Sequence, residues 1–422
     1  MNPAAIEAHL KHVLLDWGII VFAAWLFGRL ARRVGQPLAV GEILAGIVLG
    51  PSLLGTLWPA ADSLLFQPGT QQSLQLLGKL GLILLLFQVG MEFDYGHLRS
   101  RSRTVTAVSL MGLMSPFLCG LAVGPWLHRQ FAPDLPRFGF ILFFCIALSI
   151  SALPVMGRIL LEMKLERTAV GVMGISSAAI DDVIGWVLLA VASAVVTAGL
   201  DAKALSLQVA GIIAFFSVVM LVVGPWVRKL WRKSQAQHHG LTPSFMVLLL
   251  VLLVGCCLAT NTLGIFSIFG AFIFGVALHQ EAELVRAWRA KFSDFVLVAL
   301  VPVFFTNTGL NTKIGSLQTP LAWAGVAVVL AAAVAGKLGG CYLGARLTGQ
   351  GRRESACIAA LMNTRALMAL VAINIGMDLG LLNPAMFTML VLMALLTTAM
   401  TAPLLRWWLP DELKGTATSR GV

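Results

Sequence analysis

The chain has 422 residues, of which 58% are hydrophobic and 12% are charged, and its formal net charge is +11. Soluble domains are typically about 45–50% apolar and about 25% charged, so this composition excludes a soluble enzyme. In a membrane protein, the excess of lysine and arginine in cytoplasmic loops accounts for the positive charge without nucleic-acid binding. Apolar runs of the roughly 20 residues that cross a bilayer recur along the chain. We therefore expect an all-α polytopic membrane protein that is not an enzyme and carries no cofactor.

Thirteen apolar segments are predicted to span the membrane. They lie near residues 14–30, 38–50, 74–91, 104–124, 138–157, 168–199, 205–227, 243–260, 264–279, 292–309, 320–345, 355–376 and 384–405. The first is expected to be a retained span, because no small-residue cleavage site follows it.

Basic residues predict the orientation of these spans. With the C-terminus in the cytoplasm, 22 of the 30 lysines and arginines fall on the cytoplasmic side and five on the outer side, as the positive-inside rule requires. We expect a multi-pass protein of the cell (inner) membrane with its N-terminus outside and residues 411–422 as a short cytoplasmic tail.

The fifth and sixth segments carry unusual polar residues. In the fifth, Ser149 and Ser151 precede Pro154, whose missing backbone donor favours a broken helix, with a simple kink as the alternative. In the sixth, Asp181 and Asp182 are the only charged residues between positions 168 and 200. Intramembrane carboxylates are costly and mostly functional, so this pair is the first candidate site.

The eleventh segment supplies a basic residue. Lys337 lies near its middle, next to a face formed by Gly336, Gly340 and Gly344. This glycine spacing allows another helix to approach closely. A lysine on such a tightly packed helix needs a counter-charge, and the aspartate pair is the obvious one.

The twelfth segment is the second candidate broken helix, because Asn363, Thr364 and Arg365 interrupt it. It follows the first break by seven spans, so the two helices run in opposite directions. Segments four to six and eleven to thirteen therefore look like inverted repeats, and paired interruptions in two such halves indicate a transporter binding site. The charge of Arg365 is expected to offset the carbonyl ends of half-helices.

These residues fit one mechanism. Burial disfavours the charged form of a carboxylate, so Asp182 is expected to hold either a proton or Na+ or K+, which need oxygen ligands. Asp181 is expected to pair with Lys337, and the loss of this partner would release a second proton. Groups of the broken helices, including Ser149 and Ser151, would complete the ion's shell. A purely structural lysine–aspartate lock is the alternative.

Longer motifs carry a resemblance to a known family. They are "GEILAGIVLGPSLLG" (41–55), "GLILLLFQVGMEFD" (81–94), "ALSISALPVMGRILLEMKL" (147–165), "GAFIFGVALHQ" (270–280), "LVPVFFTNTGLNTKIGSL" (300–317) and "MNTRALMALVAINIG" (362–376). Together they resemble the monovalent cation:proton antiporter-2 family of the sodium/proton exchanger superfamily, nearest to the plant and fungal cation/proton exchangers.

The resemblance implies an NhaA-like fold with inverted repeats and two crossed discontinuous helices. It implies a single transporter domain over residues 1–410, with core helices at about 104–199 and 320–405 and dimer or scaffold helices at about 14–91 and 205–309. A homodimer in membrane lipid and an elevator-like movement of the core are expected. The ion-binding position maps onto Asp182, and the pair found in electrogenic members maps onto Asp181 and Lys337.

We therefore expect electrogenic exchange of Na+ or K+ for H+ by alternating access. Electroneutral K+/H+ exchange is an alternative, because the overall motifs resemble potassium-linked exchangers while the Asp–Asp–Lys set resembles sodium/proton antiporters. Transport of another solute and a cation channel are further alternatives. No role is assigned to Glu42, Lys79 or Glu92.

Overall fold

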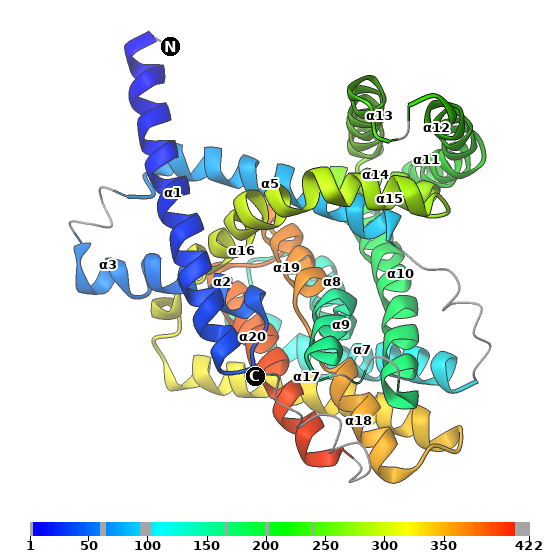
Figure 1. Cartoon of the computed structure of the whole chain (residues 1–422). Coiled ribbons are helices and arrows are strands. Elements are labelled where there is room, and N and C mark those ends of the chain that lie inside the picture. The colour runs from blue at the N-terminus through cyan, green and yellow to red at the C-terminus, as the bar shows by residue number, and fades with distance from the viewer. Residues whose placement is uncertain are drawn as a thin grey trace. The chain divides into compact units, whose positions relative to one another are not determined.

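The computed structural model describes residues 3–59, 65–92, 103–163, 165, 168–198, 202–238 and 240–409. Every regular element in these ranges is a helix (Figure 1). The α-helices are α1 (Pro3–Arg33), α2 (Leu38–Leu49), α3 (Leu54–Leu57), α5 (Pro68–Met91), α7 (Arg103–Phe131), α8 (Arg137–Ser149), α9 (Leu153–Glu162), α10 (Ala169–Ala198), α11 (Ala202–Val218), α12 (Gly224–His238), α13 (Pro243–Thr262), α14 (Ser267–Leu278), α15 (Ala282–Trp288), α16 (Val301–Leu310), α17 (Pro320–Leu347), α18 (Arg352–Met362), α19 (Leu367–Asp378) and α20 (Pro384–Trp408). Three short segments are π-helical, namely η1 (Val219–Val223), η2 (Arg289–Ser293) and η3 (Val296–Leu300), and one is a 3-10 helix, η4 (Ile314–Ser316). The expected tail at 411–422 lies outside the described residues.

Each of the thirteen predicted spans coincides with helix. Within the described ranges, nine helices are long and apolar enough to cross a membrane alone, and two bent pairs raise the number to eleven. The bent pairs are Ala282–Ser293 with Val296–Ser316 (45°) and Arg352–Met362 with Leu367–Asp378 (40°). The fifth and ninth segments contain the shorter apolar helices Arg137–Ser149 and Ser267–Leu278. The all-α polytopic class is confirmed, and the tenth segment has a bend that the sequence did not predict.

Contacts divide the chain into two compact units. Unit 1 comprises Met1–Val21, Phe66–Asp94 and Ala190–Asn307, and unit 2 comprises Phe22–Leu65, Tyr95–Leu189 and Thr308–Val422. Unit 2 contains α7 to the first part of α10 and α17 to α20, which are the two predicted inverted triplets. It also contains α2, whereas the sequence grouping put residues 14–91 with the scaffold helices. Which unit carries the ion stays a prediction.

In unit 1, α5 and α14 pack against each other through reciprocal glycines. A Cβ atom on Gly90 would lie 2.4 Å from the carbonyl oxygen of Phe272, and one on Gly275 would lie 2.2 Å from that of Phe87. The ring of Phe87 meets the ring of Trp288 edge-on at 4.9 Å between centroids. Glycine is needed here because any side chain would force the two backbones apart.

In unit 2, the predicted glycine face of α17 packs against α7. A Cβ atom on Gly340 would lie 2.3 Å from the carbonyl oxygen of Met111, and one on Gly336 would lie 2.6 Å from Cα of Pro116. Gly344 likewise lies against the α7 backbone. The expected close approach along this face is therefore present, and it fixes the face of α17 from which Lys337 projects.

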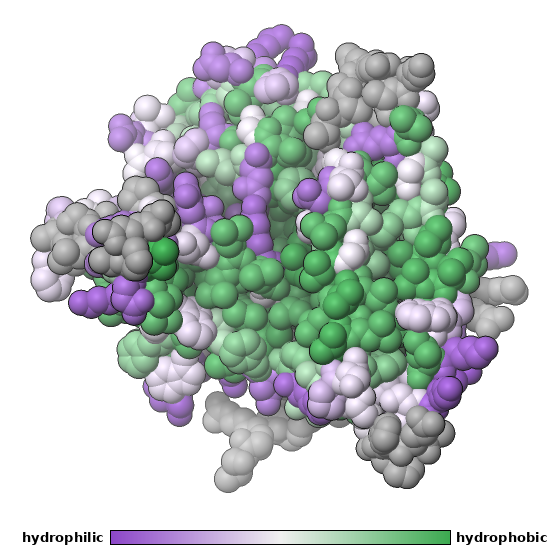
Figure 2. Space-filling model, turned by 90° about the horizontal axis from the view of Figure 1, so that it is seen from above, coloured by the Kyte–Doolittle hydropathy of each residue, from purple (hydrophilic) through white to green (hydrophobic). Residues whose placement is uncertain are grey.

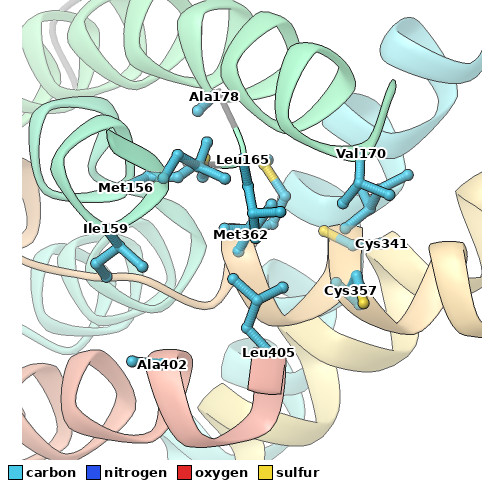
Figure 3. Close-up of a cluster of buried hydrophobic side chains, with 14 of the residues drawn as sticks. Met156, Ile159, Leu165, Val170, Ala178, Cys341, Cys357, Met362, Ala402 and Leu405 are labelled. Atoms are coloured by element: carbon cyan, nitrogen blue, oxygen red, sulfur yellow. The ribbon is translucent and has the colours of Figure 1, made fainter. Parts of the chain in front are cut away.

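A hydrophobic core in unit 2 joins α9, α10, α17, α18 and α20. Its side chains are apolar and almost fully buried, and Figure 3 shows several of them meeting from these helices: Met156, Ile159, Val170, Ala178, Cys341, Cys357, Met362, Ala402 and Leu405. Between helices in a bilayer, such side chains stabilise the fold through van der Waals packing, because lipid chains are as apolar as the side chains themselves. The cluster therefore holds the half-helices α9 and α18 in place.

Large apolar side chains are also exposed in both units. Leu221 in unit 1 and Leu347 in unit 2 are 75% and 76% exposed, and Figure 2 shows a broad hydrophobic area on the face that it presents. A water-soluble monomer rarely exposes large contiguous apolar patches. Such surfaces fit helices that contact lipid.

The glycine face gives a matched pair of variants for a stability test. Gly340→Ala places its Cβ against a backbone carbonyl, so it is expected to destabilise the protein by about 1–3 kcal/mol, as overpacking does. Gly339→Ala, one residue away, meets nothing within 4 Å and is expected to leave stability unchanged or slightly raised. The apparent midpoint of thermal unfolding in detergent measures both. Equal midpoints for the two variants would show that α7 and α17 do not pack this tightly.

Candidate functional site

The fifth predicted span is broken in its middle. α8 ends at Ser149 and α9 begins at Leu153, with residues 150–152 outside any helix. The Ser149 hydroxyl donates to the carbonyl of Cys145, one turn earlier, at 2.8 Å, and this type of contact often bends a helix. Pro154 is the second residue of α9, where no intrahelical donor is needed. Its side chain lies outside the described residues.

The twelfth predicted span is broken as well, and the two breaks contact each other. α18 ends at Met362 and α19 begins at Leu367. Oγ of Ser151 lies 3.0 Å from the carbonyl oxygen of Met362, and the backbone N–H of Ala152 donates to the carbonyl of Thr364 at 2.9 Å. The ends of four half-helices therefore meet at one place in unit 2.

A buried ion pair lies beside this meeting point. Nζ of Lys337 on α17 is 2.7 Å from Oδ2 of Asp181 on α10, and both side chains are fully buried. The same Nζ donates to the backbone carbonyl of Ser149 at 2.7 Å. Ser151 donates to Oδ2 of Asp181 at 3.0 Å, and Ser109 donates to Oδ1 at 2.6 Å. Both carboxylate oxygens of Asp181 are thus satisfied, and Lys337 uses a carbonyl that the first break leaves free.

The sequence interpretation missed Ser109, which is fully buried on α7. A signal was present, because Ser109 and Gly112 are three residues apart and so share one face of a helix. A Cβ atom on Gly112 would lie 2.5 Å from Sγ of Cys341 and 3.7 Å from Nζ of Lys337. This small-residue face of α7 is what admits the lysine side chain.

Asp182 follows Asp181 on α10 but has a different environment. Its side chain is 4% exposed. The backbone N–H of Leu153, the first residue of α9, donates a hydrogen bond to its carboxyl group, at the positive end of that helix's dipole. Among the described residues, Oδ1 of Asp182 has no hydrogen-bond partner. A buried polar oxygen without a partner is costly, so this oxygen is free to bind a proton or a cation.

Arg365 lies in the second break and is fully buried. Its guanidinium donates to the backbone carbonyl of Ala333 on α17 at 2.9 Å, and its backbone N–H donates to the hydroxyl of Thr398 on α20 at 3.1 Å. The Thr398 hydroxyl also reaches the carbonyl of Arg365. No ion pair involves Arg365 in the part of the chain that the structure describes, and its guanidinium faces the carbonyl of Ala333 and the sulfur of Met393 instead of a carboxylate.

Threonines of α20 hold the rest of the second break. The Thr364 hydroxyl donates to the hydroxyl of Thr401 at 3.2 Å, and the side-chain amide of Asn363 donates to the carbonyl of Thr397 at 3.4 Å. The sequence interpretation assigned no role to these threonines. The polar run "TTAMT" at 397–401 inside an apolar helix was the available signal.

The structure therefore brings most of the sequence-derived candidates together. Asp181, Lys337 and Ser151 are in direct contact, while Ser149 contributes its carbonyl and not its hydroxyl. Asp182 contacts the start of α9.

The residues without an assigned role are elsewhere. Glu92 accepts a hydrogen bond from Gln88 in unit 1 at 3.0 Å, Lys79 is exposed, and Glu42 is buried on α2.

Comparison with known proteins gives the family. Residues 18–409 match the model for the transmembrane sodium/hydrogen exchanger. The chain is 37% identical over 394 residues to the Na(+)/H(+) antiporter NhaS4 of Synechocystis, covering 93% of this chain and 96% of that protein. It is 33% identical over 406 residues to the Cation/H(+) antiporter 17 of Arabidopsis thaliana, covering 96% of this chain and 49% of that protein. The chain thus spans about half the length of the plant relative.

A solved structure shows the same fold. The sodium proton antiporter MjNhaP1 of Methanocaldococcus jannaschii superposes with a TM-score of 0.70 at 15% sequence identity, covering 97% of this chain and 99% of that one. This likeness concerns the fold alone, and it agrees with the NhaA-like class that the sequence predicted. Family model, relatives and fold agree: the chain belongs to the transmembrane sodium/hydrogen exchanger family.

Proposed function

We propose that this protein exchanges Na+ or K+ for H+ across its membrane and that Asp182 binds the two in turn. The observation that carries the proposal is the buried carboxylate of Asp182, with one oxygen unpartnered, next to a carboxylate that Lys337 already neutralises. The names of the relatives, a Na(+)/H(+) antiporter and a Cation/H(+) antiporter, support this class of substrates.

The two neighbouring carboxylates differ in charge balance. Asp181 has a cation at 2.7 Å and two hydroxyl donors, whereas Asp182 has the N–H dipole of Leu153. An ionised carboxylate without a counter-charge is unstable in a low-dielectric interior, so Asp182 needs a proton or a metal cation. Since either one supplies the single positive charge that is missing, the two compete. Competition at a site that opens to each side in turn produces exchange.

The broken helices supply the remaining groups in this proposal. Ser151 and the backbone around positions 150–152 offer oxygens and N–H groups at the depth of the carboxylates. Arg365 places a positive charge in the second break, where its guanidinium donates to the carbonyl of Ala333 on α17. Asp181, Lys337 and an Asp182 that has bound its proton or cation together carry no net charge.

The behaviour of the Asp181–Lys337 pair determines how many protons are exchanged for each cation. If Lys337 stays protonated, one cation replaces one proton and no net charge moves. If cation binding draws Asp181 away from Lys337, the buried ammonium loses its partner and releases a second proton. We propose this second course, which makes transport electrogenic. Electroneutral K+/H+ exchange is the alternative, in which the pair serves only to lock α10 to α17.

The wider setting is proposed from the family resemblance. Unit 2 carries the site and is the candidate for the moving core, while unit 1 is the candidate for the scaffold of a homodimer. Alternating access by an elevator movement, the cell membrane as location, and a cytoplasmic C-terminus belong to the same proposal.

Asp182→Asn is expected to abolish exchange, because it keeps the side-chain volume and removes the charge. A hydrogen bond or contact with a charged group contributes up to about 3 kcal/mol, and losing it corresponds to a decrease in cation affinity of about 100-fold or more. The measurement is the dissipation of a pH gradient in proteoliposomes on addition of Na+ or K+. Asp16→Asn is the matched control, because Asp16 is a buried carboxylate in unit 1, 1% exposed, and this variant should retain exchange. Unchanged rates in Asp182→Asn would show that the site is wrong.

The double variant Asp181→Asn/Lys337→Gln tests the stoichiometry. It removes both charges of the pair together and is expected to leave exchange that no longer responds to membrane voltage. Proteoliposomes with an imposed potassium-diffusion potential, assayed with Na+, measure this response. A wild-type response to voltage in the double variant would exclude the pair as the source of the second proton.

Stability separates this effect from misfolding. Lys337→Gln alone leaves an uncompensated buried carboxylate and is expected to cost about 3–5 kcal/mol, whereas the double variant should recover most of this loss. Thermal unfolding of the three purified proteins supplies the comparison.

A further inference from the structure

A groove of about 490 Å³ lies on unit 2 where α17, α18 and α20 meet. Its floor is apolar and includes Leu338, Tyr342 and Trp408, and its mouth is lined by Arg352 and Arg353. All three helices are membrane-spanning or belong to a broken span. The groove is separate from the Asp181–Lys337 pair, because Lys337 is fully buried and points toward α10.

The groove has space that the described part of the chain does not fill. Gly339 lines it, and a Cβ atom added there would meet nothing within 4 Å. Leu338, Tyr342 and Trp408 are only partly buried, although they pack against the core cluster of Figure 3. An apolar groove on a spanning helix is covered by whatever surrounds that helix, which in a bilayer is acyl chain.

The mouth of the groove is basic. Arg352 and Arg353 are exposed at the first turn of α18, whose backbone N–H groups carry partial positive charge. Arg346, at the end of α17, donates to the carbonyl of Gln350 nearby. The acidic residue of this turn, Glu354, accepts a hydrogen bond from the Gly351 N–H at 3.0 Å, so it serves as a helix cap. The mouth therefore favours an anion.

We propose that this groove binds one anionic phospholipid, with its phosphate at Arg352 and Arg353 and an acyl chain along Leu338, Tyr342 and Trp408. The volume lies in the usual range of about 300–1,000 Å³ for small-molecule pockets. Tryptophan and arginine are typical of the membrane–water interface. The basic-residue bias puts this end of α17 and α18 in the cytoplasm, where the leaflet carries anionic lipid.

The bound lipid braces the half-helix that leads to the second break. α18 directs Cys357 and Met362 into the core cluster (Figure 3) and ends at Met362, directly before the break that contains Arg365. A lipid in the groove would hold α18 against α17 and α20. The consequence for transport, but not the binding itself, rests on the proposed function.

The test is lipid binding to the detergent-purified full chain, measured by native mass spectrometry with phosphatidylglycerol and phosphatidylcholine of equal chain length. Wild type is expected to prefer phosphatidylglycerol. Arg352→Gln/Arg353→Gln is expected to weaken phosphatidylglycerol binding about 30-fold, since each basic residue contributes about fivefold. Arg32→Gln/Arg33→Gln removes an equal charge from the exposed end of α1 and should change binding less than twofold.

A second pair of variants tests the apolar floor. Gly339→Leu fills the groove and is expected to abolish binding of both lipids. Gly18→Leu adds the same side chain at a position on α1 that also has nothing within 4 Å, and it should bind as wild type does. Thermal unfolding must show that the variants are folded.

Three results would overturn the proposal. Equal binding of phosphatidylglycerol to wild type and both arginine variants would exclude the mouth as the headgroup site. Displacement by millimolar inorganic phosphate would indicate a free-phosphate site.

A cysteine introduced as Gly339→Cys that a maleimide cannot reach in lipid-free detergent would show that the chain itself covers the groove. Protection of that cysteine by phosphatidylglycerol and not by phosphatidylcholine is the expected result.

Discussion

The contact between Lys337 and Asp181 is the constraint on which the rest of unit 2 depends. Two full charges inside a membrane protein persist only when each is paired and its remaining hydrogen-bonding groups are satisfied. The chain meets this demand with Ser109, Ser151 and the free carbonyl of Ser149. The Ser149 carbonyl is available to Lys337 only because α8 ends at Ser149. The ion pair therefore depends on the helix break. It also depends on the close packing of the α17 glycine face against α7, whose small residues leave room for the lysine side chain.

Once Asp181 is satisfied, the adjacent carboxylate remains. Asp182 is buried beside the start of α9 and has one oxygen without a partner in the described part of the chain. One helix turn thus presents two chemically identical groups in different electrostatic conditions, one paired with the Lys337 ammonium and one without a counter-charge in contact. This division of roles is what the proposed exchange requires, because a site that the protein neutralised by itself would have no need of either substrate.

The sequence predicted much of this arrangement, since charge, proline and glycine in an apolar span are informative by their rarity. Asp181, Asp182, Lys337, both breaks and the packing face of α17 stood out on that ground. Ser109 and Thr398 did not, because single hydroxyl residues are common in membrane helices and only tertiary contact shows which are used. The bend between η2 and η3 carries no proline. The donor from Leu153 to Asp182 is a backbone group, which a side-chain motif does not reveal.

The central claim is that one buried carboxylate binds either a proton or an alkali cation. Its most direct test is proton release from the detergent-solubilised protein when Na+ or K+ is added, followed with a pH indicator in weak buffer. We predict release that saturates with cation concentration, is half-maximal at higher concentration as the pH is lowered, and is absent from Asp182→Asn. Saturable cation binding without proton release, or release that persists in Asp182→Asn, would contradict it.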